Sequence, residues 1–364
     1  MITFDPPENV GGVEGRAAAY ASGLGNRYFV DIIALAPSFA YSTTHFHGAP
    51  LHRFPSSSRR VLRSFKSAVG ETSSNSIDSI FLLSGALTLF GVLMLLYARL
   101  TSRKSLIFLY GKDILRARQN PLESGLLAIA SLLASTIAVN SRFTASLLPP
   151  HLGKRTGILY PGVDPDIAGQ VSVDSRRRDK AKTILFVGRL VWRKGADDLI
   201  RAFSRLDGTV GEVRLEVVGD GPEMDHLRGL ARDLGVEDRA RFFGTLTGRA
   251  LYERFASADV FAMPSKTTRE DVEGFGTVFL EAGLFGKPSV GTNSGGIPEA
   301  IVDGVTGIVV QEGDLDALTE ALREMVSDDE KSRTIGNNAQ RLVSSKFTWD
   351  ASCAALARLL ETPE

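Results

Sequence analysis

This sequence has a single cysteine, no excess of charge of either sign, and few long apolar runs. A single cysteine excludes an intrachain disulfide and is typical of proteins from a reducing compartment. The 42 basic and 42 acidic residues cancel, so the overall balance gives no sign of nucleic acid as a partner. The first ten residues also lack the basic start and the apolar run of a secretory signal. We therefore expect a cytoplasmic protein.

One stretch departs from this pattern. Residues 80–98 are nineteen residues without a charge, and basic residues follow them. Hydropathy alone allows a transmembrane helix here, which would make the protein an integral membrane protein. The alternative is a buried strand, a turn at Ser84 and Gly85, and then a packed helix. The β-like IFLL before the turn and the low apolarity of Thr88 and Gly91 favour this second interpretation.

The charges are distributed unevenly along the chain. Residues 1–163 contain sixteen Lys and Arg against eight Asp and Glu, a balance of +8, so the remainder carries −8. The excess bases form two groups, which are Arg53, Arg59, Arg60, Arg63 and Lys66, and then Arg99, Arg103, Lys104, Lys112, Arg116 and Arg118. They are either solvated surface or a face for anionic lipid headgroups or an anionic acceptor. The second interpretation predicts a peripheral protein on the inner face of a membrane.

Apolar β-like runs alternate with helical patterns in both halves, as in KTILFVG followed by ADDLIRAFSRL. This alternation, over 364 residues, predicts two α/β domains with parallel sheets. Residues 41–76 show no clear element. We place an N-terminal domain at 1–163, a C-terminal domain at 164–345, and a final helix within 346–364 that crosses back to the first domain. Ligands of such folds bind beyond the carboxyl ends of strands, so a cleft between the domains is the expected site.

Basic residues follow the first strand of the second half. Gly188 closes that strand and lets the backbone turn tightly. Arg189 and Lys194 come next, and both could face a diphosphate, because Arg offers paired donors and Lys a compact charge. Surface charges beside a turn would give the same pattern, so this motif alone is weak.

A glycine-rich loop comes later in the same half. Gly274 and Gly276 precede a helix, where exposed backbone amides can hold phosphate oxygens. Glu281 lies on that helix and could accept hydrogen bonds from ribose hydroxyls. Glu273 lies in the loop and could contact a sugar.

These motifs occur together with the turn Gly219-Asp220-Gly221-Pro222 and the paired glycines of Gly295-Gly296-Ile297-Pro298-Glu299. Their order and spacing resemble glycosyltransferase family 4, which contains retaining enzymes of the GT-B fold. The resemblance covers residues 155–350 and is weaker upstream, where Gly11 and Gly12 match best. Residues 271–299 look most like the mannosyltransferases that build phosphoinositol mannosides. The resemblance implies an α/β fold of two facing Rossmann-like domains with a cleft between them.

The resemblance also assigns roles to single residues. Arg189 and Lys194 would stabilise the leaving diphosphate, and Glu273 would hold the transferred sugar as the third catalytic residue. Gly12 would let the donor approach from the first domain. The predicted substrate-binding residues are Gly12, Gly188, Gly219, Gly274, Phe275, Gly276, Thr277 and Glu281.

The implied activity is transfer of a hexosyl unit from a nucleoside diphosphate sugar to a glycan or lipid-linked acceptor, without a cofactor. One departure bears on it: many family members have a histidine where this chain has Leu83-Ser84-Gly85. A catalytically inactive partner subunit therefore remains an alternative.

A nicotinamide dehydrogenase would need a G-x-G-x-x-G after the first strand, and the sequence offers no convincing one. Asp164-Pro165-Asp166 spells a metal-binding Asp-x-Asp, but its place at the domain junction argues against a metal.

Overall fold

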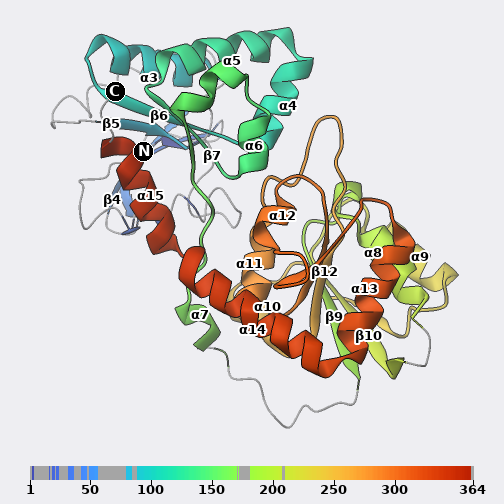
Figure 1. Cartoon of the computed structure of the whole chain (residues 1–364). Helices are drawn as coiled ribbons and strands as arrows, with labels where there is room; N and C mark the ends of the chain where they lie inside the picture. Colours follow the sequence, from blue (N-terminus) through green and yellow to red (C-terminus); the bar gives the residue numbers. More distant parts are fainter. Residues whose placement is uncertain are drawn as a thin grey trace. The chain divides into compact units, whose positions relative to one another are not determined.

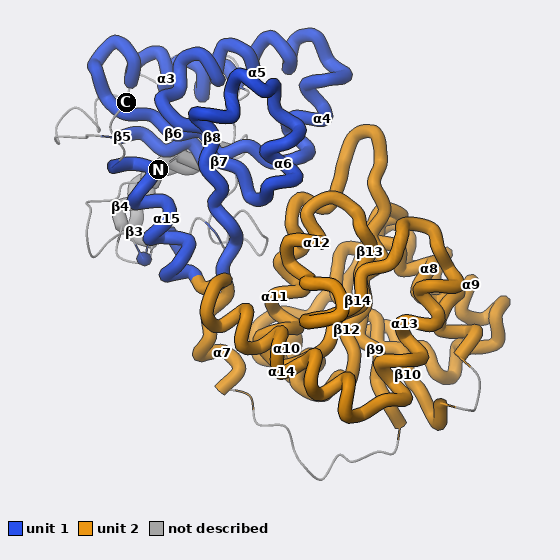
Figure 2. Tube along the Cα trace, viewed as in Figure 1, with its two compact units in different colours: residues 1–162, 349–364 blue, residues 163–348 orange. Residues whose placement is uncertain are grey.

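The computed structural model of the chain is drawn in Figure 1. It divides into two compact units, residues 1–162 with 349–364 (unit 1) and residues 163–348 (unit 2), as Figure 2 shows. The structure describes residues 2–3, 16, 19–20, 22–23, 32–36, 42–46, 49–55, 79–83, 88–169, 171, 181–206 and 210–361.

Unit 1 is built on a sheet of eight described strands, in the order β3-β4-β2-β1-β5-β6-β7-β8. All neighbours are parallel except the edge strand β3, which pairs with β4 in the antiparallel sense. The strands are β1 Ile2–Thr3, β2 Ile32–Ala36, β3 Ser42–Phe46, β4 Ala49–Pro55, β5 Ser79–Leu82, β6 Lys104–Leu109, β7 Thr136–Val139 and β8 Thr156–Ile158. Among the described residues, the helices of this unit with defined bounds are α3 Leu89–Leu100, α4 Gly111–Gln119, α5 Pro121–Leu133, α6 Arg142–Ser146 and α15 Trp349–Glu361, with a 3₁₀ turn at Pro150–Arg155.

The two faces of this sheet are covered by different helices because side chains alternate along each strand. Ile80 and Leu82 of β5 point into a core shared with α3 and α5. Phe81 points to the other face, into a core shared with Leu356 of α15. Both sheet faces are therefore covered, as the near-continuous apolar strands predict.

The last helix is tied to the start of the chain. Ser352 of α15 lies 3.0 Å from the Tyr20 hydroxyl and donates to the carbonyl of Tyr160 at 2.7 Å. Arg16 is buried, donates to the Leu159 carbonyl at 3.2 Å, and places its guanidinium 4.5 Å from the Phe108 ring centroid. The Ser352 contacts explain why residues 349–364 group with the first 162 residues rather than with the unit that precedes them.

Two sequence expectations for unit 1 can be compared with the structure. The apolar stretch 80–98 is the predicted strand and helix, divided between β5 and the twelve-residue helix α3. Within the described residues, no helix combines the length and apolarity needed to cross a membrane. The expectation that 41–76 contains no clear element was wrong, because β3 and β4 pair as a hairpin there. Their polar residues and the prolines of β4 mask the strand pattern.

Unit 2 contains a six-stranded sheet in which all described neighbours are parallel. The strand order is β11-β10-β9-β12-β13-β14, the doubly wound order of dinucleotide-binding folds. The strands are β9 Lys182–Val187, β10 Val213–Val218, β11 Ala240–Phe242, β12 Val260–Met263, β13 Ser289–Thr292 and β14 Gly307–Val310. The helices are α7 Asp166–Gly169, α8 Ala196–Ser204, α9 Met224–Asp233, α10 Gly248–Ser257, α11 Thr277–Leu284, α12 Ile297–Ala300, α13 Leu315–Ser327 and α14 Asp329–Lys346, with a 3₁₀ turn at Trp192–Lys194.

The long helix α14 packs against α11 along a narrow face of small and β-branched residues. Ile335, Gly336, Ala339 and Val343 are buried at helical spacing. Gly336 permits the close contact, because a Cβ atom there would lie 2.1 Å from the carbonyl oxygen of Gly286. A strongly polar sequence with such a narrow buried face gives little apolar periodicity, so the sequence pattern did not predict this helix.

Candidate functional site

The switch point of the sheet in unit 2 lies between β9 and β12. Chain connections leave these two strands toward opposite sides, and ligands of such sheets bind in the crevice beyond the strands' carboxyl ends. The loop after β9 carries Arg189 and Lys194, and the long loop after β12 carries Glu273. The fold therefore places the three predicted catalytic residues on the two loops that border the switch point.

Two glycines allow these loops to come close together. Gly195 has φ +71°, and a Cβ atom there would lie 1.9 Å from the carbonyl oxygen of Pro264. Gly295 has φ +57°, and its Cβ would lie 2.1 Å from the carbonyl oxygen of Glu273. Side chains at these positions would push the loops apart. The paired glycines of the GGIPE motif thus support the backbone beneath Glu273.

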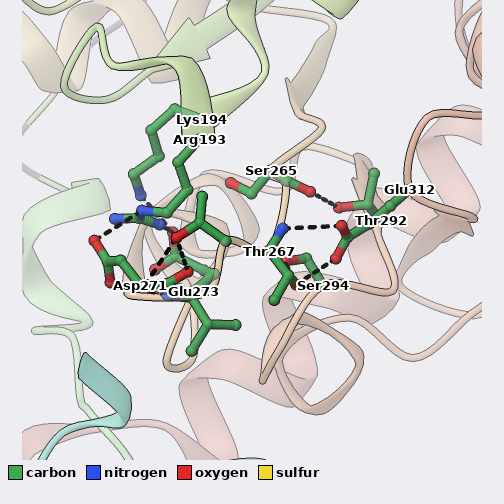
Figure 3. Close-up of polar contacts among 11 residues, drawn as sticks. Arg193, Lys194, Ser265, Thr267, Asp271, Glu273, Thr292, Ser294 and Glu312 are labelled. Atoms are coloured by element: carbon green, nitrogen blue, oxygen red, sulfur yellow. Dashed lines mark hydrogen bonds and ion pairs between the residues drawn. The ribbon is translucent and has the colours of Figure 1, made fainter. Parts of the chain in front are cut away.

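The side chains form an ion cluster at this junction, drawn in Figure 3. Lys194 Nζ donates to Glu273 Oε2, and Arg193 Nη1 lies 3.2 Å from the same oxygen. Arg193 Nε lies 3.0 Å from Asp271 Oδ2. The Lys194 and Glu273 side chains are only 14% and 13% exposed. Two cations and two carboxylates therefore share a small and largely shielded volume.

The charges of this cluster keep Glu273 ionised. Burial alone would raise the pKa of its carboxyl, but the neighbouring charges of Lys194 and Arg193 hold the pKa below its usual value. Glu273 is therefore a fixed, negatively charged acceptor near neutral pH. A hydroxyl-bearing ligand can donate hydrogen bonds to such a group.

The start of the β12 loop is anchored independently of this cluster. Lys266 Nζ pairs with Asp197 at 2.9 Å and with Asp198 at 3.0 Å. The Thr267 amide donates to Glu312 Oε2 at 2.9 Å (Figure 3). These contacts fix the loop against α8 on one side and against the residues after β14 on the other, which limits the positions open to Glu273.

Arg189 is not part of the cluster, although the sequence predicts that it acts together with Lys194. Its side chain is exposed and has no hydrogen-bond or ion partner among the described residues. The loop beneath it is ordered by the Leu190 amide, which donates to the Asp220 carbonyl at 2.9 Å. Arg189 is thus a cation at the switch point that is free to meet an anion.

The glycine-rich loop lies where the sequence predicts it, directly before α11. Gly276 is the residue before the helix, with φ +84°, and Thr277 is its first residue. Phe275 is 2% exposed, and its ring centroid lies 5.5 Å from that of Phe347. A ligand at this loop would therefore meet the backbone at Phe275, because the ring belongs to the core.

Glu281 has a different environment from Glu273. It lies on α11, is partly exposed, and its carboxylate has no hydrogen-bond or ion partner among the described residues. Burial raises its pKa to about 7. Its charge also raises the pKa of Tyr252 on α10, where burial is the larger cause. Glu281 is thus separate from the ion cluster and changes charge near neutral pH.

The remaining predicted positions fall into three groups. Gly188 and Gly219 follow β9 and β10, and their amides donate to Val218 and Gly244 at 3.0 and 2.7 Å. Gly12 lies outside the described residues. Asp164 Oδ1 accepts a hydrogen bond from the Asp166 amide at 3.0 Å, and no three His, Cys, Asp or Glu among the described residues are placed to hold a metal ion.

Sequence reasoning missed Arg193 and Asp271, which connect the cluster. Arg193 precedes Lys194, and Asp271 lies two residues before Glu273. The available signal was that a base lies beside Lys194 and an acid lies near Glu273. No spacing rule, however, links Arg193 to Asp271, which are 78 positions apart in the chain.

The doubly wound sheet, the cations at its switch point and the glycine loop before α11 form the arrangement on which many α/β units bind nucleotides. Comparisons with known proteins are more specific. Residues 170–342 match the family described as "Glycosyl transferases group 1". This match confirms the resemblance to glycosyltransferase family 4 and covers most of unit 2.

Relatives with named activities match half of the chain or more. The GDP-mannose-dependent alpha-(1-6)-phosphatidylinositol monomannoside mannosyltransferase of Mycolicibacterium smegmatis is 36% identical over 237 residues, covering 62% of either chain. A GDP-mannose-dependent mannosyltransferase for the monoacylated form of this lipid, from Corynebacterium glutamicum, is 35% identical over 186 residues, covering 50% of this chain and 48% of the relative. The chain thus spans less than two thirds of the relatives it matches.

Solved structures match nearly the whole chain. Anabaena HepE, in complex with UDP and glucose, gives a TM-score of 0.78 at 22% identity and covers 99% of this chain and 98% of its own. WaaG, a glycosyltransferase involved in lipopolysaccharide biosynthesis, gives 0.68 at 18% identity and covers 100% of this chain and 99% of its own. At these identities the likeness concerns the fold, and it confirms the predicted α/β GT-B fold.

Proposed function

We propose that this protein is a retaining glycosyltransferase. It transfers a hexosyl unit, mannosyl or glucosyl, from a nucleoside diphosphate sugar to a lipid-linked or glycan acceptor in envelope polysaccharide or glycolipid synthesis. Unit 2 binds the donor and unit 1 binds the acceptor. The observation that carries the proposal is the contact of Lys194 with Glu273 at the switch point of the sheet.

This contact brings together the two groups that such a donor needs. The diphosphate requires cations, which Lys194 and the free Arg189 supply. The sugar requires hydrogen-bond acceptors for its hydroxyls, which the ionised Glu273 supplies. Arg193 keeps a counter-charge on Glu273 when Lys194 turns to the diphosphate, so the carboxylate stays charged and in place.

The proposed reaction takes place on one face of the sugar. The acceptor hydroxyl forms the new bond to the anomeric carbon as the bond to the diphosphate oxygen breaks. The hydroxyl proton moves to the departing diphosphate. The anomeric configuration is retained because attack and departure take place on the same face. Negative charge builds up on the diphosphate in this step, so the largest contribution of the protein is electrostatic, through Arg189 and Lys194.

The relatives support a sugar donor of this kind without fixing it. GDP-mannose is named for the mycobacterial and corynebacterial enzymes, and UDP with glucose for the HepE structure. The phosphatidylinositol mannoside named for the first group is a lipid. A lipid-linked acceptor is therefore the acceptor class we favour, with the protein in the cytoplasm and in peripheral contact with an anionic membrane.

An inactive partner subunit is the second candidate. It is suggested by Leu83-Ser84-Gly85, which stand where many family members have a histidine. The intact ion cluster argues against it, because a subunit without catalysis has no need for a shielded Lys194–Glu273 pair.

Thermal unfolding with a panel of nucleotide sugars tests the proposal. A ligand that binds only the folded protein raises its melting temperature by mass action. We expect GDP-mannose or UDP-glucose to stabilise the wild-type protein and to release nucleoside diphosphate over time. Stabilisation without release, in the presence of extracted lipid acceptors, would favour the inactive subunit. No stabilisation by any member of the panel would contradict donor binding.

A further inference from the structure

Helix α8 begins next to the ion cluster without a side-chain cap. Its N-cap is Gly195, where a Cβ atom would lie 1.9 Å from the carbonyl oxygen of Pro264. The unpaired amides of a helix N-terminus carry partial positive charge, which acids in the first turn stabilise. Asp197 and Asp198 occupy that first turn. The helix start therefore has two acids, three and four residues after Lys194.

These two acids oppose the binding of an anion to the same loop. The diphosphate of the proposed donor is an anion, and in the proposed function it lies against Lys194. Like charges repel, and solvent screens the repulsion less where the side chains are shielded from water. The side chains of Asp197 and Asp198 are only 17% and 23% exposed. Their negative charge would therefore weaken diphosphate binding unless a cation neutralised it.

Lys266 supplies this cation from the loop after β12. Its Nζ atom lies 2.9 Å from Asp197 Oδ2 and 3.0 Å from Asp198 Oδ2, and its side chain is 12% exposed. Its backbone amide donates to the Arg193 carbonyl at 2.7 Å, which holds Lys266 beside the turn that carries the cations of the cluster. The three side chains carry one positive and two negative charges, so Lys266 halves the net negative charge of the acid pair.

The ammonium group of Lys266 is also in contact with an aromatic ring. Its Nζ atom lies 4.7 Å from the centroid of the Trp192 ring, whose electron-rich face attracts a cation. Lys266 is thus engaged by the two acids and by the ring, whereas the charge of Arg189 is free for a ligand. Trp192 itself is 53% exposed, so solutes in water can reach its ring.

We propose that Lys266 is a positioning residue of the donor site, which neutralises Asp197 and Asp198 and so keeps Lys194 available to the diphosphate. The inference rests on the proposed function for the identity of the anion. Neutralisation differs from anchoring of the loop in what it requires. An anchor requires the ion pairs themselves, whereas neutralisation requires only a balance of charge. The two roles therefore predict opposite results when the acids are replaced.

Calorimetric titration with GDP and with UDP at low salt tests the proposal. Lys266→Met should bind the nucleotide at least about fivefold more weakly than the wild type, because the acids then repel the diphosphate. Asp197→Asn/Asp198→Asn, with Lys266 in place, should bind at least as tightly as the wild type. Adding both acid changes to Lys266→Met should restore the lost affinity, since the net charge then returns to zero.

Lys182→Met is the matched control. Lys182 also pairs with two aspartates, Asp259 at 3.5 Å and Asp329 at 2.6 Å. It is the first residue of β9 and so lies at the end of that strand opposite to the switch-point loops. This variant should bind GDP and UDP like the wild type. Circular dichroism confirms that each variant is folded, and the acid variant keeps the test decisive if Lys266→Met is unstable.

A second measurement needs no nucleotide. Trp349→Phe leaves Trp192 as the sole tryptophan, and its fluorescence can be quenched by iodide, an anion, or by caesium, a cation. The ratio of the two quenching constants reports the sign of the charge near the ring and cancels changes in its exposure. This iodide-to-caesium ratio should fall in Lys266→Met, and it should rise above the wild-type ratio when Asp197 and Asp198 are replaced.

Unchanged affinity in Lys266→Met would overturn the inference, and so would an unchanged quenching ratio. Weaker nucleotide binding by Asp197→Asn/Asp198→Asn would overturn it as well, because it would show that the ion pairs act as an anchor. If the wild-type protein binds neither GDP nor UDP while the quenching ratio follows the charge, the proposed function is contradicted and the neutralisation of the acids is confirmed.

Discussion

Arg193 and Lys194 both contact the same carboxylate oxygen of Glu273. The Nη1 atom of Arg193 lies 3.2 Å from Glu273 Oε2, and its Nε atom lies 3.0 Å from Asp271 Oδ2. A guanidinium that spans two carboxylates fixes their separation, which a lysine cannot do with a single point charge. We therefore regard Arg193 as a residue that positions Glu273 for the sugar.

Arg193→Gln should lower kcat by roughly ten- to a hundredfold, the range expected when a hydrogen bond to a charged group is lost. It should also change the pH profile. The charges of Lys194 and Arg193 hold the pKa of Glu273 below its usual value, so removing one of them raises that pKa. The acid limb of the rate profile should then move to higher pH, which steady-state kinetics across pH will measure.

The lowered pKa of Glu273 also makes the stability of the folded protein depend on pH. A lowered carboxyl pKa contributes stability above the ordinary pKa of glutamate, and this contribution is lost as pH falls through the lowered value. Arg193→Lys should recover part of the rate that Arg193→Gln loses. Arg249→Gln, which removes an exposed pair with Glu253, is the matched control and should keep the wild-type rate. An unchanged acid limb in Arg193→Gln would show that Arg193 does not act through Glu273.

Glu281 should release a proton when nucleotide binds. Burial raises its pKa to about 7, so at pH 6.5 much of it is protonated in the free protein. Ribose hydroxyls that donate to its carboxylate would favour the charged form and lower the pKa. Calorimetric titration with nucleoside diphosphate in buffers of different ionisation enthalpy should detect this proton.

Glu281→Gln should abolish the proton release and weaken binding of the free nucleoside diphosphate. Glu273→Gln should keep the release, since Glu273 is already ionised, and should lower turnover of the sugar nucleotide instead. Stability gives a second readout. The raised pKa of Glu281 stabilises the folded state at low pH, and this contribution is lost as pH rises through about 7. Equal proton release by wild type and Glu281→Gln would remove the ribose assignment.

Activity should persist in excess chelator. In the proposed site Arg189 and Lys194 would provide two positive charges for the diphosphate, and Asp164 accepts a hydrogen bond from the Asp166 amide. Initial rates with and without EDTA, followed by addition of Mg²⁺ or Mn²⁺, are the measurement. Loss of activity in EDTA that a divalent cation restores would contradict this prediction.

The sequence predicted apolar elements better than polar ones for a physical reason. The strands β9, β12 and β13 are short apolar runs that end at turns, and parallel strands buried on both faces read in this way. The hairpin of β3 and β4 and the helix α14 have polar sequences, and their place is set by tertiary contacts that no local pattern reports.

The candidate site shows the same limit. Lys194, Glu273 and the glycines before α11 were predicted because their motifs occur in a family order, while the bridge through Arg193 and Asp271 depends on two loops meeting in space. The exposure of Arg189 and the separation of Glu281 from the cluster likewise depend on the three-dimensional fold, which no local pattern reports.

The most direct measurement is the rate of nucleoside diphosphate release from the stabilising sugar nucleotide, compared between the wild-type protein and Lys194→Ala. Our account predicts a rate lower by about 10²–10³-fold, the scale for losing one donor to a developing anion. Arg189→Ala should give a similar loss, and Lys331→Ala, which removes a surface pair with Glu324, should not. A Lys194→Ala enzyme that releases diphosphate at the wild-type rate would contradict the assignment of this site.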